Sequence, residues 1–456
     1  MSKTEETTFR DRPINIDDTG RRKWIQARQP KGKWYNRRTL FAWCCILFLV
    51  LAPIIKINGN PLMLLDIAHR NFSIFAVQFW AQDANILALI MLIVVVFIVL
   101  FTVIFGRLWC GWACPQTIFL EMVYRRIEYL IDGNHRNIRK EQSSKHNLLF
   151  RRILKHVIFL IVSVLITNIM LMWFVGTERL IEIITSPIRD HLLGFGVLMG
   201  ISIFYYWIYA YFREQVCTMI CPYGRMQGVL MDSKSLSVIY DYKRGEPRGS
   251  KTSGDCIDCS RCISVCPTGI DIKNGTQLEC INCTACIDEC NQVMKKLKKP
   301  AGLIRFDSVF GVENGIRSII NTRSIAYSFV SVILLVILGF TIAGRTPVET
   351  SLLRVPGTIY QEIGTDTLSN VYTLKVLNKS NKHKEIQFRL LSPEHGSIQM
   401  AANKISLPED ETYENILLIK LHRKSINSSS TKIIVGIFEE DNMLERVFIN
   451  FVGPEK

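Results

Sequence analysis

The stretch GDCIDCSRCISVCPTGIDIKNGTQLECINCTACIDECNQVM (residues 254–294) contains eight of the fourteen cysteines in this 456-residue chain. The eight form two runs with the spacing C-x2-C-x2-C-x3-C, the first followed by Pro267 and the second by Asn291. In such runs three thiolates on a tight loop ligate three irons of a cubane, and the fourth cysteine ligates the neighbouring cluster. The spacing therefore predicts two [4Fe-4S] clusters. Cysteine set 1, for the first cluster, comprises Cys256, Cys259, Cys262 and Cys290. Cysteine set 2, for the second cluster, comprises Cys266, Cys280, Cys283 and Cys286.

The other common uses of clustered cysteines fit this stretch less well. Structural zinc sites usually take two C-x2-C pairs separated by a longer loop, not doubled runs of four cysteines. Disulfides are rare in a reducing compartment. Two clusters in tandem carry single electrons, so the stretch predicts an electron conduit rather than a centre that makes or breaks substrate bonds.

Outside the cysteine stretch, the chain contains long apolar runs. Hydrophobic residues make up 48% of the sequence and charged residues 21%. This balance excludes a disordered protein and an ordinary soluble one. Runs of about 20 apolar residues can cross a hydrocarbon core of roughly 30 Å. Five transmembrane helices are predicted, near residues 40–57, 85–106, 153–175, 192–212 and 325–343.

The lysines and arginines alternate across these spans. Eleven precede the first span, nine lie between the second and third, and sixteen lie between the fourth and fifth, whereas the other two connections carry one and two. Because cytoplasmic segments are enriched in Lys and Arg, the N-terminus and the cysteine stretch are predicted to be cytoplasmic and the part after residue 344 external. The formal net charge of +15 thus reflects topology, and no nucleic-acid partner is expected.

Four further cysteines stand in two similar motifs, WCGWACPQ and VCTMICPY, at the cytoplasmic ends of the second and fourth spans. Each motif has the form C-x-x-x-C-P, so two sulfurs would share one face of a helix, and the proline would loosen that turn. The repeat suggests two similar halves that bring the four thiols together, a donor set that suits Cu(I). The alternative is that these four cysteines are buried residues with a packing role only. These interface thiols, the candidates for copper binding or reduction, are Cys110, Cys114, Cys217 and Cys221.

The C-terminal part alternates apolar and polar residues in short segments, which predicts a β-sandwich without a catalytic cluster. The expected fold is therefore an α-helical membrane protein with a cytoplasmic ferredoxin-like domain and a C-terminal β-sandwich. The predicted order is a basic tail (1–39), a four-span core (40–240), a linker (241–253), a two-cluster domain (254–306), a connector with the fifth span (307–344) and the outer domain (345–456).

The ordered set of motifs resembles the CcoG/FixG (RdxA) family of cytochrome c oxidase accessory proteins over nearly the full length. Besides the cysteine stretch, the motifs that carry the resemblance are AVQFWAQDANILAL (76–89), GRLWCGWACPQT (106–117), REQVCTMICPYGRMQ (213–227), YDYKRGEPRGS (240–250) and GLIRF (302–306). Ferredoxin-type cysteine runs occur in many proteins, whereas the ordered set with RGEPRGS is specific. The outer part is similar to the immunoglobulin-like domain of that family.

The resemblance implies a protein of the bacterial inner membrane, with a periplasmic C-terminal domain, that assists assembly of a cbb(3)-type cytochrome c oxidase. Its two [4Fe-4S] clusters, held by sets 1 and 2, would reduce Cu(II) to Cu(I), with the interface thiols as the copper site. As an enzyme it would be a cupric reductase. The implied partners are copper ion, membrane lipid, a copper transporter and a chaperone or oxidase assembly proteins, and a homodimer is compatible with this role.

Two alternatives remain open at this point. One is a quinol-oxidising electron-transfer subunit similar to the NapH or NosR membrane proteins, which share the polyferredoxin and C-x-x-x-C-P architecture. The immunoglobulin-like domain and the lack of a flavin-binding outer domain weigh against it. The other is a non-catalytic assembly scaffold with structural clusters. The sequence does not identify the electron donor, which is either cytoplasmic or a quinol.

Overall fold

The computed structural model describes residues 21–22, 24–68, 70–80, 83–133, 145–249, 253–316, 320–357, 359–364, 366–379, 383–393, 395–400, 404–408, 412–426 and 428–454, with the backbone alone for 145–148. Most of the predicted basic tail therefore lies outside the described residues. The chain divides into two compact units. The first consists mainly of Leu87–Ile337 and the second mainly of Leu338–Lys456.

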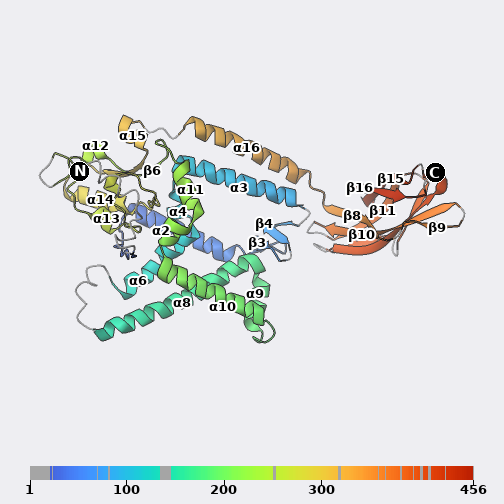
Figure 1. Cartoon of the computed structure of the whole chain (residues 1–456), viewed down its shortest axis with the longest axis horizontal. Helices are drawn as coiled ribbons and strands as arrows, with labels where there is room; N and C mark the ends of the chain where they lie inside the picture. Colours follow the sequence, from blue (N-terminus) through green and yellow to red (C-terminus); the bar gives the residue numbers. More distant parts are fainter. Residues whose placement is uncertain are drawn as a thin grey trace. The chain divides into compact units, whose positions relative to one another are not determined.

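Long helices dominate the first unit (Figure 1). They are α2 (Lys33–Leu51), α3 (Ala84–Phe105), α8 (Lys145–Val175), α10 (Leu192–Trp207), continued by the π-helix η3 (Ile208–Phe212), and α16 (Thr322–Ala343). Among the described residues, four stretches are long and apolar enough to cross a membrane: Ala84–Phe105, Leu149–Val175, Leu192–Phe212 and Thr322–Ala343. Four of the five expected spans thus lie in such helices, and α8 packs against α10.

Helix α2 occupies the place of the first expected span but is not among these four. The helix ends at Leu51, and its first turns carry Arg37 and Arg38, so its apolar part is shorter than the run at residues 40–57 suggested. Near its C-terminal end, the Leu49 carbonyl accepts a 2.8 Å hydrogen bond from Trp173 Nε1, close to the end of α8. By length and composition the structure thus supports four of the five expected spans, and the span at residues 40–57 stays a prediction.

Short elements connect the long helices. They are β1 (Lys56–Ile57), β2 (Asn60–Pro61), β3 (Met63–Asp66), β4 (Asn71–Ile74), β5 (Val77–Phe79), α4 (Leu108–Trp112), α5 (Pro115–Phe119), η2 (Leu120–Tyr124), α6 (Arg125–Ile131), α9 (Thr177–Thr185), η4 (Val216–Ile220) and α11 (Pro222–Leu230).

Both C-x-x-x-C-P motifs break the helix at the second cysteine. Cys114 and Cys221 have extended backbones, with ψ of 124° and 111°, and the next helix begins at the following proline. The expectation that both sulfurs of a pair lie on one continuous helix is therefore wrong. The physical reason is that a residue before proline avoids the helical region, whereas proline itself is well suited to the first helical position.

The cysteine stretch folds with residues on both sides of it. Its elements are β6 (Ser237–Tyr240), α12 (Tyr242–Gly245), α13 (Arg261–Ser264), η5 (Ile272–Asn274), α14 (Ala285–Lys296), β7 (Ile304–Asp307) and α15 (Val309–Asn314). Strands β6 and β7 pair antiparallel, with Ser237 opposite Asp307. The stretch expected to be a linker, residues 241–253, therefore begins directly after a strand of this cluster domain.

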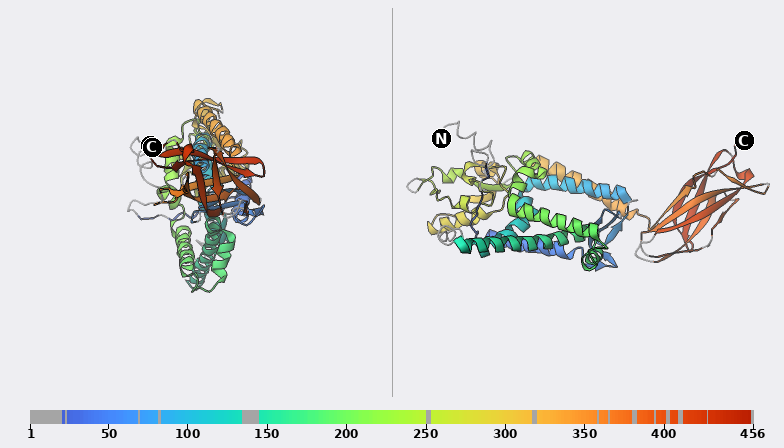
Figure 2. Two further views of the ribbon diagram at one scale, coloured as in Figure 1. Left: turned by 90° about the vertical axis from the view of Figure 1, so that its right-hand side faces the viewer. Right: turned by 60° about the horizontal axis from the view of Figure 1, so that its bottom comes forward.

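The second unit contains the predicted β-sandwich. Its strands are β8 (Val348–Arg354), β9 (Gln361–Ile363), β10 (Thr367–Asn378), β11 (Lys384–Ser392), β12 (Gly396–Gln399), β13 (Ile405–Leu407), β14 (Thr412–His422), β15 (Ser430–Glu439) and β16 (Asn442–Val452), with the 3-10 turn η6 (Arg423–Ser425). One sheet has the order β12-β14-β10-β8, with β9 also on β10, and the other has the order β13-β11-β15-β16. The strands of the two sheets are drawn in orange and red in Figure 2. Residues from both sheets, such as Leu374 and Val435, share one buried core. The alternating pattern therefore predicted this fold correctly.

Candidate functional site

Each cysteine set surrounds its own cavity in the cluster domain. The four cysteines of set 1 line one cavity together with Tyr240, Lys273 and Met294. The four cysteines of set 2 line the other together with Cys262 and Thr268. Cys266 and Cys290 thus each lie with the run to which they do not belong, as the crossed ligand scheme expects. All fourteen cysteines of the chain are free.

The loops around the two cavities share an unusual backbone. Asp258 and Ser260 in the first run have φ of 54° and 52°, and Asn282 and Thr284 at the equivalent positions of the second run have 53° and 64°. Left-handed residues placed between right-handed ones turn successive N–H groups into a concave nest that binds anions, including iron–sulfur centres. Two cavities with thiol donors and such loops fit two [4Fe-4S] clusters, which have negatively charged sulfur ligands.

Each set has two buried cysteines, and among the eight only Cys259 of set 1 is exposed. Burial raises the pKa of Cys262 and Cys280 to about 12 and that of Cys283 to about 11. These thiols are therefore protonated at neutral pH unless metal binds, and metal binding would release their protons.

The first C-x-x-x-C-P motif packs directly on the set 2 loop. Cys110 is buried in one apolar cluster with Val265, Ile281 and Cys283. Trp112 Nε1 donates a 3.3 Å hydrogen bond to the carbonyl of Asn282. The structure thus brings one interface thiol into the same packed cluster as a set 2 cysteine.

The four interface thiols also approach one another, although they come from two distant parts of the chain. Burial first, and then the charges of the other three, raise the pKa of Cys217 to about 12. The pKa of Cys110 is raised by burial to about 11, with Cys114 and Cys221 among the charges that act on it. Cys221 likewise acts on the raised pKa of Cys114. The two motifs are neighbours in the structure, since Cys110 Sγ lies 3.0 Å from Gln227 on the helix that follows the second motif, whereas a single site shared by all four thiols stays a prediction. Within the described part of the chain, no three His, Cys, Asp or Glu side chains are grouped around a position for one metal ion.

Polar side chains fix the position of the Cys110 thiol. Its Sγ donates to Oε1 of Gln227 at 3.0 Å, and Gln227, which is fully buried, lies 3.4 Å from the hydroxyl of Thr102. The buried guanidinium of Arg107 acts on the pKa of Cys110 in the opposite direction to burial. The thiol therefore has both a hydrogen-bond acceptor and a nearby cation.

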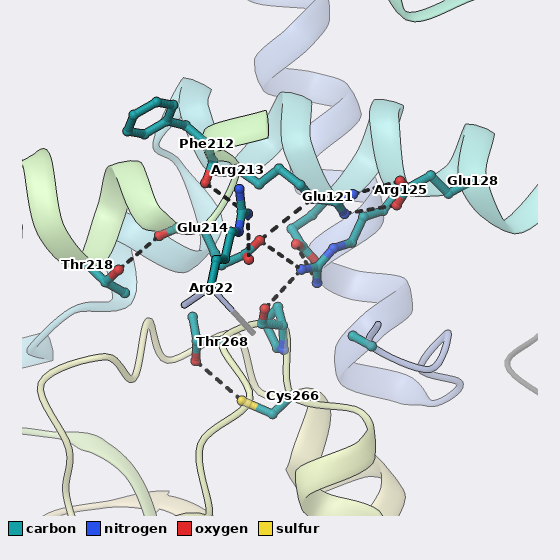
Figure 3. Close-up of polar contacts among 12 residues, drawn as sticks. Arg22, Glu121, Arg125, Glu128, Phe212, Arg213, Glu214, Thr218, Cys266 and Thr268 are labelled. Carbon is teal, nitrogen blue, oxygen red and sulfur yellow. Dashed lines mark hydrogen bonds and ion pairs between the residues drawn. The ribbon is translucent and has the colours of Figure 1, made fainter. Parts of the chain in front are cut away.

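Arg125 connects the membrane helices to set 2 (Figure 3). Its side chain is 2% exposed and lies 2.9 Å from Glu121 and 3.7 Å from Glu214. Its Nη2 donates a 2.9 Å hydrogen bond to the carbonyl of Pro267, the residue after Cys266. A buried arginine with two carboxylate partners thus supports the backbone of a set 2 loop.

The same ion network extends to the end of η3. Arg213 donates two hydrogen bonds, of 2.7 and 2.9 Å, to the carboxylate of Glu128, and Arg22 lies 3.2 Å from Glu214. Burial alone would raise the pKa of Glu128, but the Arg213 hydrogen bond and charge lower it below its ordinary value. The carboxylate of Glu128 therefore remains ionised at neutral pH.

The sequence interpretation did not identify several residues that shape this site. They are Arg107, Gly111, Arg125, Gln227 and Asn282. Their contacts join residues far apart in the chain, and the one local signal is the i, i+4 spacing of Glu121 and Arg125, which predicts a helical ion pair.

Comparison with protein families adds three matches. Residues 212–252 and 246–309 match a 4Fe-4S dicluster domain, and residues 87–134, which include Cys110 and Cys114, match a 4Fe-4S binding domain. Residues 338–454 match the IG-like fold at the C-terminus of FixG, a putative oxidoreductase.

Three curated proteins are similar over long parts of the chain. The protein RdxB of Cereibacter sphaeroides is 26% identical over 86% of this chain and 87% of its own length. RdxA of the same organism is 30% identical over 80% of this chain and 81% of its own length. The nitrogen fixation protein FixG of Rhizobium meliloti is 33% identical over 63% of this chain and 57% of its own length. The crystal structure of a FixG-related protein from Vibrio parahaemolyticus, 20% identical, covers 24% of this chain and 97% of its own, with a TM-score of 0.21.

Proposed function

The chain belongs to the RdxA and FixG family of iron–sulfur electron-transfer proteins, and on this premise we propose that it reduces Cu(II) to Cu(I) during assembly of a cbb(3)-type cytochrome c oxidase. One observation carries the proposal: Cys110 packs in one buried cluster with Cys283 of set 2. An interface thiol thus lies beside a proposed cluster ligand.

The donor sets of the two sites suit this reaction. Sets 1 and 2 would hold two [4Fe-4S] clusters, which supply one electron each when bound. Reduction of one Cu(II) to Cu(I) consumes one electron, and thiolates favour the soft Cu(I) product. The interface thiols, with Arg107 and Gln227 beside Cys110, would receive the copper ion as substrate.

We further propose the location and partners that go with this role. Five spans would place the N-terminus and the cluster domain in the cytoplasm and the β-sandwich in the periplasm of an inner membrane, as the Lys and Arg distribution predicts. A cysteine introduced at exposed Leu278 of the cluster domain would then react with a membrane-impermeant maleimide only from the cytoplasmic side. A copper transporter, a chaperone or oxidase assembly proteins would exchange copper with the chain.

The decisive experiment measures Cu(I) formation by the purified protein. The protein is reduced with dithionite, freed of excess reductant and mixed with Cu(II) and a Cu(I)-specific chelator. We expect rapid recovery of the cluster absorbance that dithionite had bleached, because Cu(II) oxidises the clusters, with formation of one Cu(I) per electron.

The variant for this experiment replaces all four interface thiols with serine, and the matched control replaces Cys44 and Cys45 on α2. We expect the fourfold variant to lose most of the rate and the control to keep it. Equal rates in the fourfold variant and the wild type would refute the copper site. A wild type that stays reduced in the presence of Cu(II) would refute cupric reduction and favour a structural role for the clusters.

A further inference from the structure

A second site lies on the other side of the ion network from set 2. It is a cavity of about 520 Å³ lined by α6, the first turns of α8, the end of η3 and residues 24–27. His156, Tyr211 and Arg125 are among its lining residues. Because it lies at the ends of the spans Leu149–Val175 and Leu192–Phe212, it is at the boundary between hydrocarbon and water.

An apolar groove on the surface of α8 leads to this α6–α8 cavity. The groove is lined by Ile153, Val157, Leu160 and Tyr206, and it shares Arg152 and His156 with the cavity. Ile153, Val157 and Leu160 are all exposed, in a helix long and apolar enough to span a membrane. A polar cavity continuous with an open apolar groove fits a ligand with a polar head and a long hydrocarbon tail.

The charged groups around the cavity are mostly paired. Arg213 is hydrogen-bonded to Glu128, and Lys155 lies 2.7 Å from Asp132. Arg152 alone of these cations has no ion-pair partner in the described ranges. The other three cations are neutralised by carboxylates. The rest of the polar lining is therefore open to an uncharged ring, and an anionic lipid phosphate on Arg152 is the competing outcome of the test below.

The remaining polar groups suit a flat ring with hydroxyl groups. Nδ1 of His156 lies 2.9 Å from the hydroxyl of Tyr206. Its second nitrogen, Nε2, has no hydrogen-bond partner among the residues that the structure describes. The imidazole also lies roughly parallel to the ring of Tyr211, with 6.4 Å between centroids and 21° between planes. The cavity thus offers aromatic surface and one unpaired ring nitrogen that can accept or donate a proton.

The cavity is also close to the electron conduit. Arg125 lines it, and the same guanidinium is hydrogen-bonded to the carbonyl of Pro267, next to Cys266. One side chain therefore separates the cavity from a set 2 loop.

We propose that the α6–α8 cavity binds the ring of an isoprenoid quinol, with its tail in the α8 groove, and that this quinol is the electron donor. Oxidation of the quinol to the quinone breaks two O–H bonds and releases two electrons and two protons. The two electrons match two one-electron acceptors, one proton passes to Nε2 of His156 and the other to water. The inference rests on the proposed function, whose electron donor it names.

The test measures binding of quinone to the full-length protein, without copper or reductant. The protein is placed in phosphatidylcholine nanodiscs and titrated calorimetrically with decylubiquinone and with a short-chain menaquinone. We expect saturable binding of one quinone per chain. Val157→Trp should block the groove and weaken binding at least tenfold, and His156→Leu should weaken it similarly. The matched control Ile161→Trp, which changes an exposed residue on the same helix outside the groove, should bind as the wild type does.

Several results would overturn the inference. They are absence of saturable binding to the wild type, equal weakening by Val157→Trp and Ile161→Trp, and competition by phosphatidylglycerol in the nanodisc that abolishes quinone binding. Retained cluster absorbance at 400 nm checks that each variant is folded. If no quinone binds but dithionite-reduced protein still forms Cu(I), the inference is wrong and the proposed function stands. If quinone binds and no Cu(I) forms, the proposed function is wrong and the binding site stands.

Discussion

Gly111 lies against Ile281 so closely that a Cβ atom on Gly111 would collide with the carbonyl oxygen of Ile281. This contact joins the first C-x-x-x-C-P motif to the set 2 loop, and its length depends on the absence of a side chain. The same glycine carbonyl accepts a 2.8 Å hydrogen bond from the buried Nε of Arg38. The close packing of the first C-x-x-x-C-P motif on the set 2 loop, a candidate electron route, therefore depends on one glycine.

Gly111→Ala should separate the two backbones. The added methyl group cannot be accommodated without a shift of the loop, at a cost of about 1–3 kcal/mol, as for other overpacked sites. We expect slower reoxidation of the dithionite-reduced clusters by Cu(II), measured by stopped flow as the recovery of their absorbance, and a lower thermal midpoint for loss of the cluster absorbance. Gly196→Ala on α10 is the control, since no atom lies within 4 Å of its added Cβ. Wild-type kinetics in Gly111→Ala would contradict the route.

Iron analysis tests the crossed ligand scheme. The wild type should contain about eight iron atoms per chain, since each of two clusters holds four. Cys290→Ser should remove one cluster and Cys266→Ser the other, each leaving about four irons. Mössbauer spectra of the two variants should then differ, because each retains a different cluster. A content of about twelve irons would mean that the interface thiols hold a third cluster, and the match of residues 87–134 to a 4Fe-4S binding domain makes this measurement informative.

Local patterns in the sequence predicted much of this architecture. Cluster ligands follow a short fixed spacing, so the composition of sets 1 and 2 could be proposed without a structure, and alternation predicted the sandwich. The helices break at Cys114 and Cys221 because a residue before proline disfavours the helical backbone. The sequence therefore contains the signal for this break, which the i, i+4 helical interpretation of the cysteine pairs does not use. The contacts between the membrane helices and the cluster domain could not be predicted in this way. Gln227 and Arg125 bind partners more than 100 residues away in the chain, and no local pattern indicates such pairs. Hydropathy also placed the first span beyond the point where α2 ends.

Replacing Arg125 with methionine should destabilise the first unit. Its removal takes the 2.9 Å cation from half-buried Glu121. Buried Glu214 keeps Arg22 and Arg213, so the cost should lie below the value of about 3–5 kcal/mol for a fully broken buried ion pair. We expect a marked fall in the denaturant concentration at the unfolding midpoint, measured from the loss of cluster absorbance. Arg323→Met is the control, since its 3.8 Å pair with Asp232 is exposed and worth about 0–1 kcal/mol. Equal effects of the two substitutions would show that Arg125 has no structural role in the network.

The second unit should respond to pH through Glu445. Burial, with the charge of Glu349, raises the pKa of Glu445 above its ordinary value, although its carboxylate accepts a 2.8 Å hydrogen bond from the backbone N–H of Thr350. A raised folded-state pKa means that ionisation opposes folding, so this destabilisation is complete above the folded pKa and disappears below the unfolded value. Glu445→Gln keeps the acceptor oxygen and should raise the thermal midpoint of the β-sandwich at pH 7 but not at pH 4, as measured by calorimetry. Glu414→Gln, at an exposed position paired with Lys375, should change neither midpoint appreciably. A gain for Glu445→Gln that is the same at both pH values would exclude ionisation as its cause.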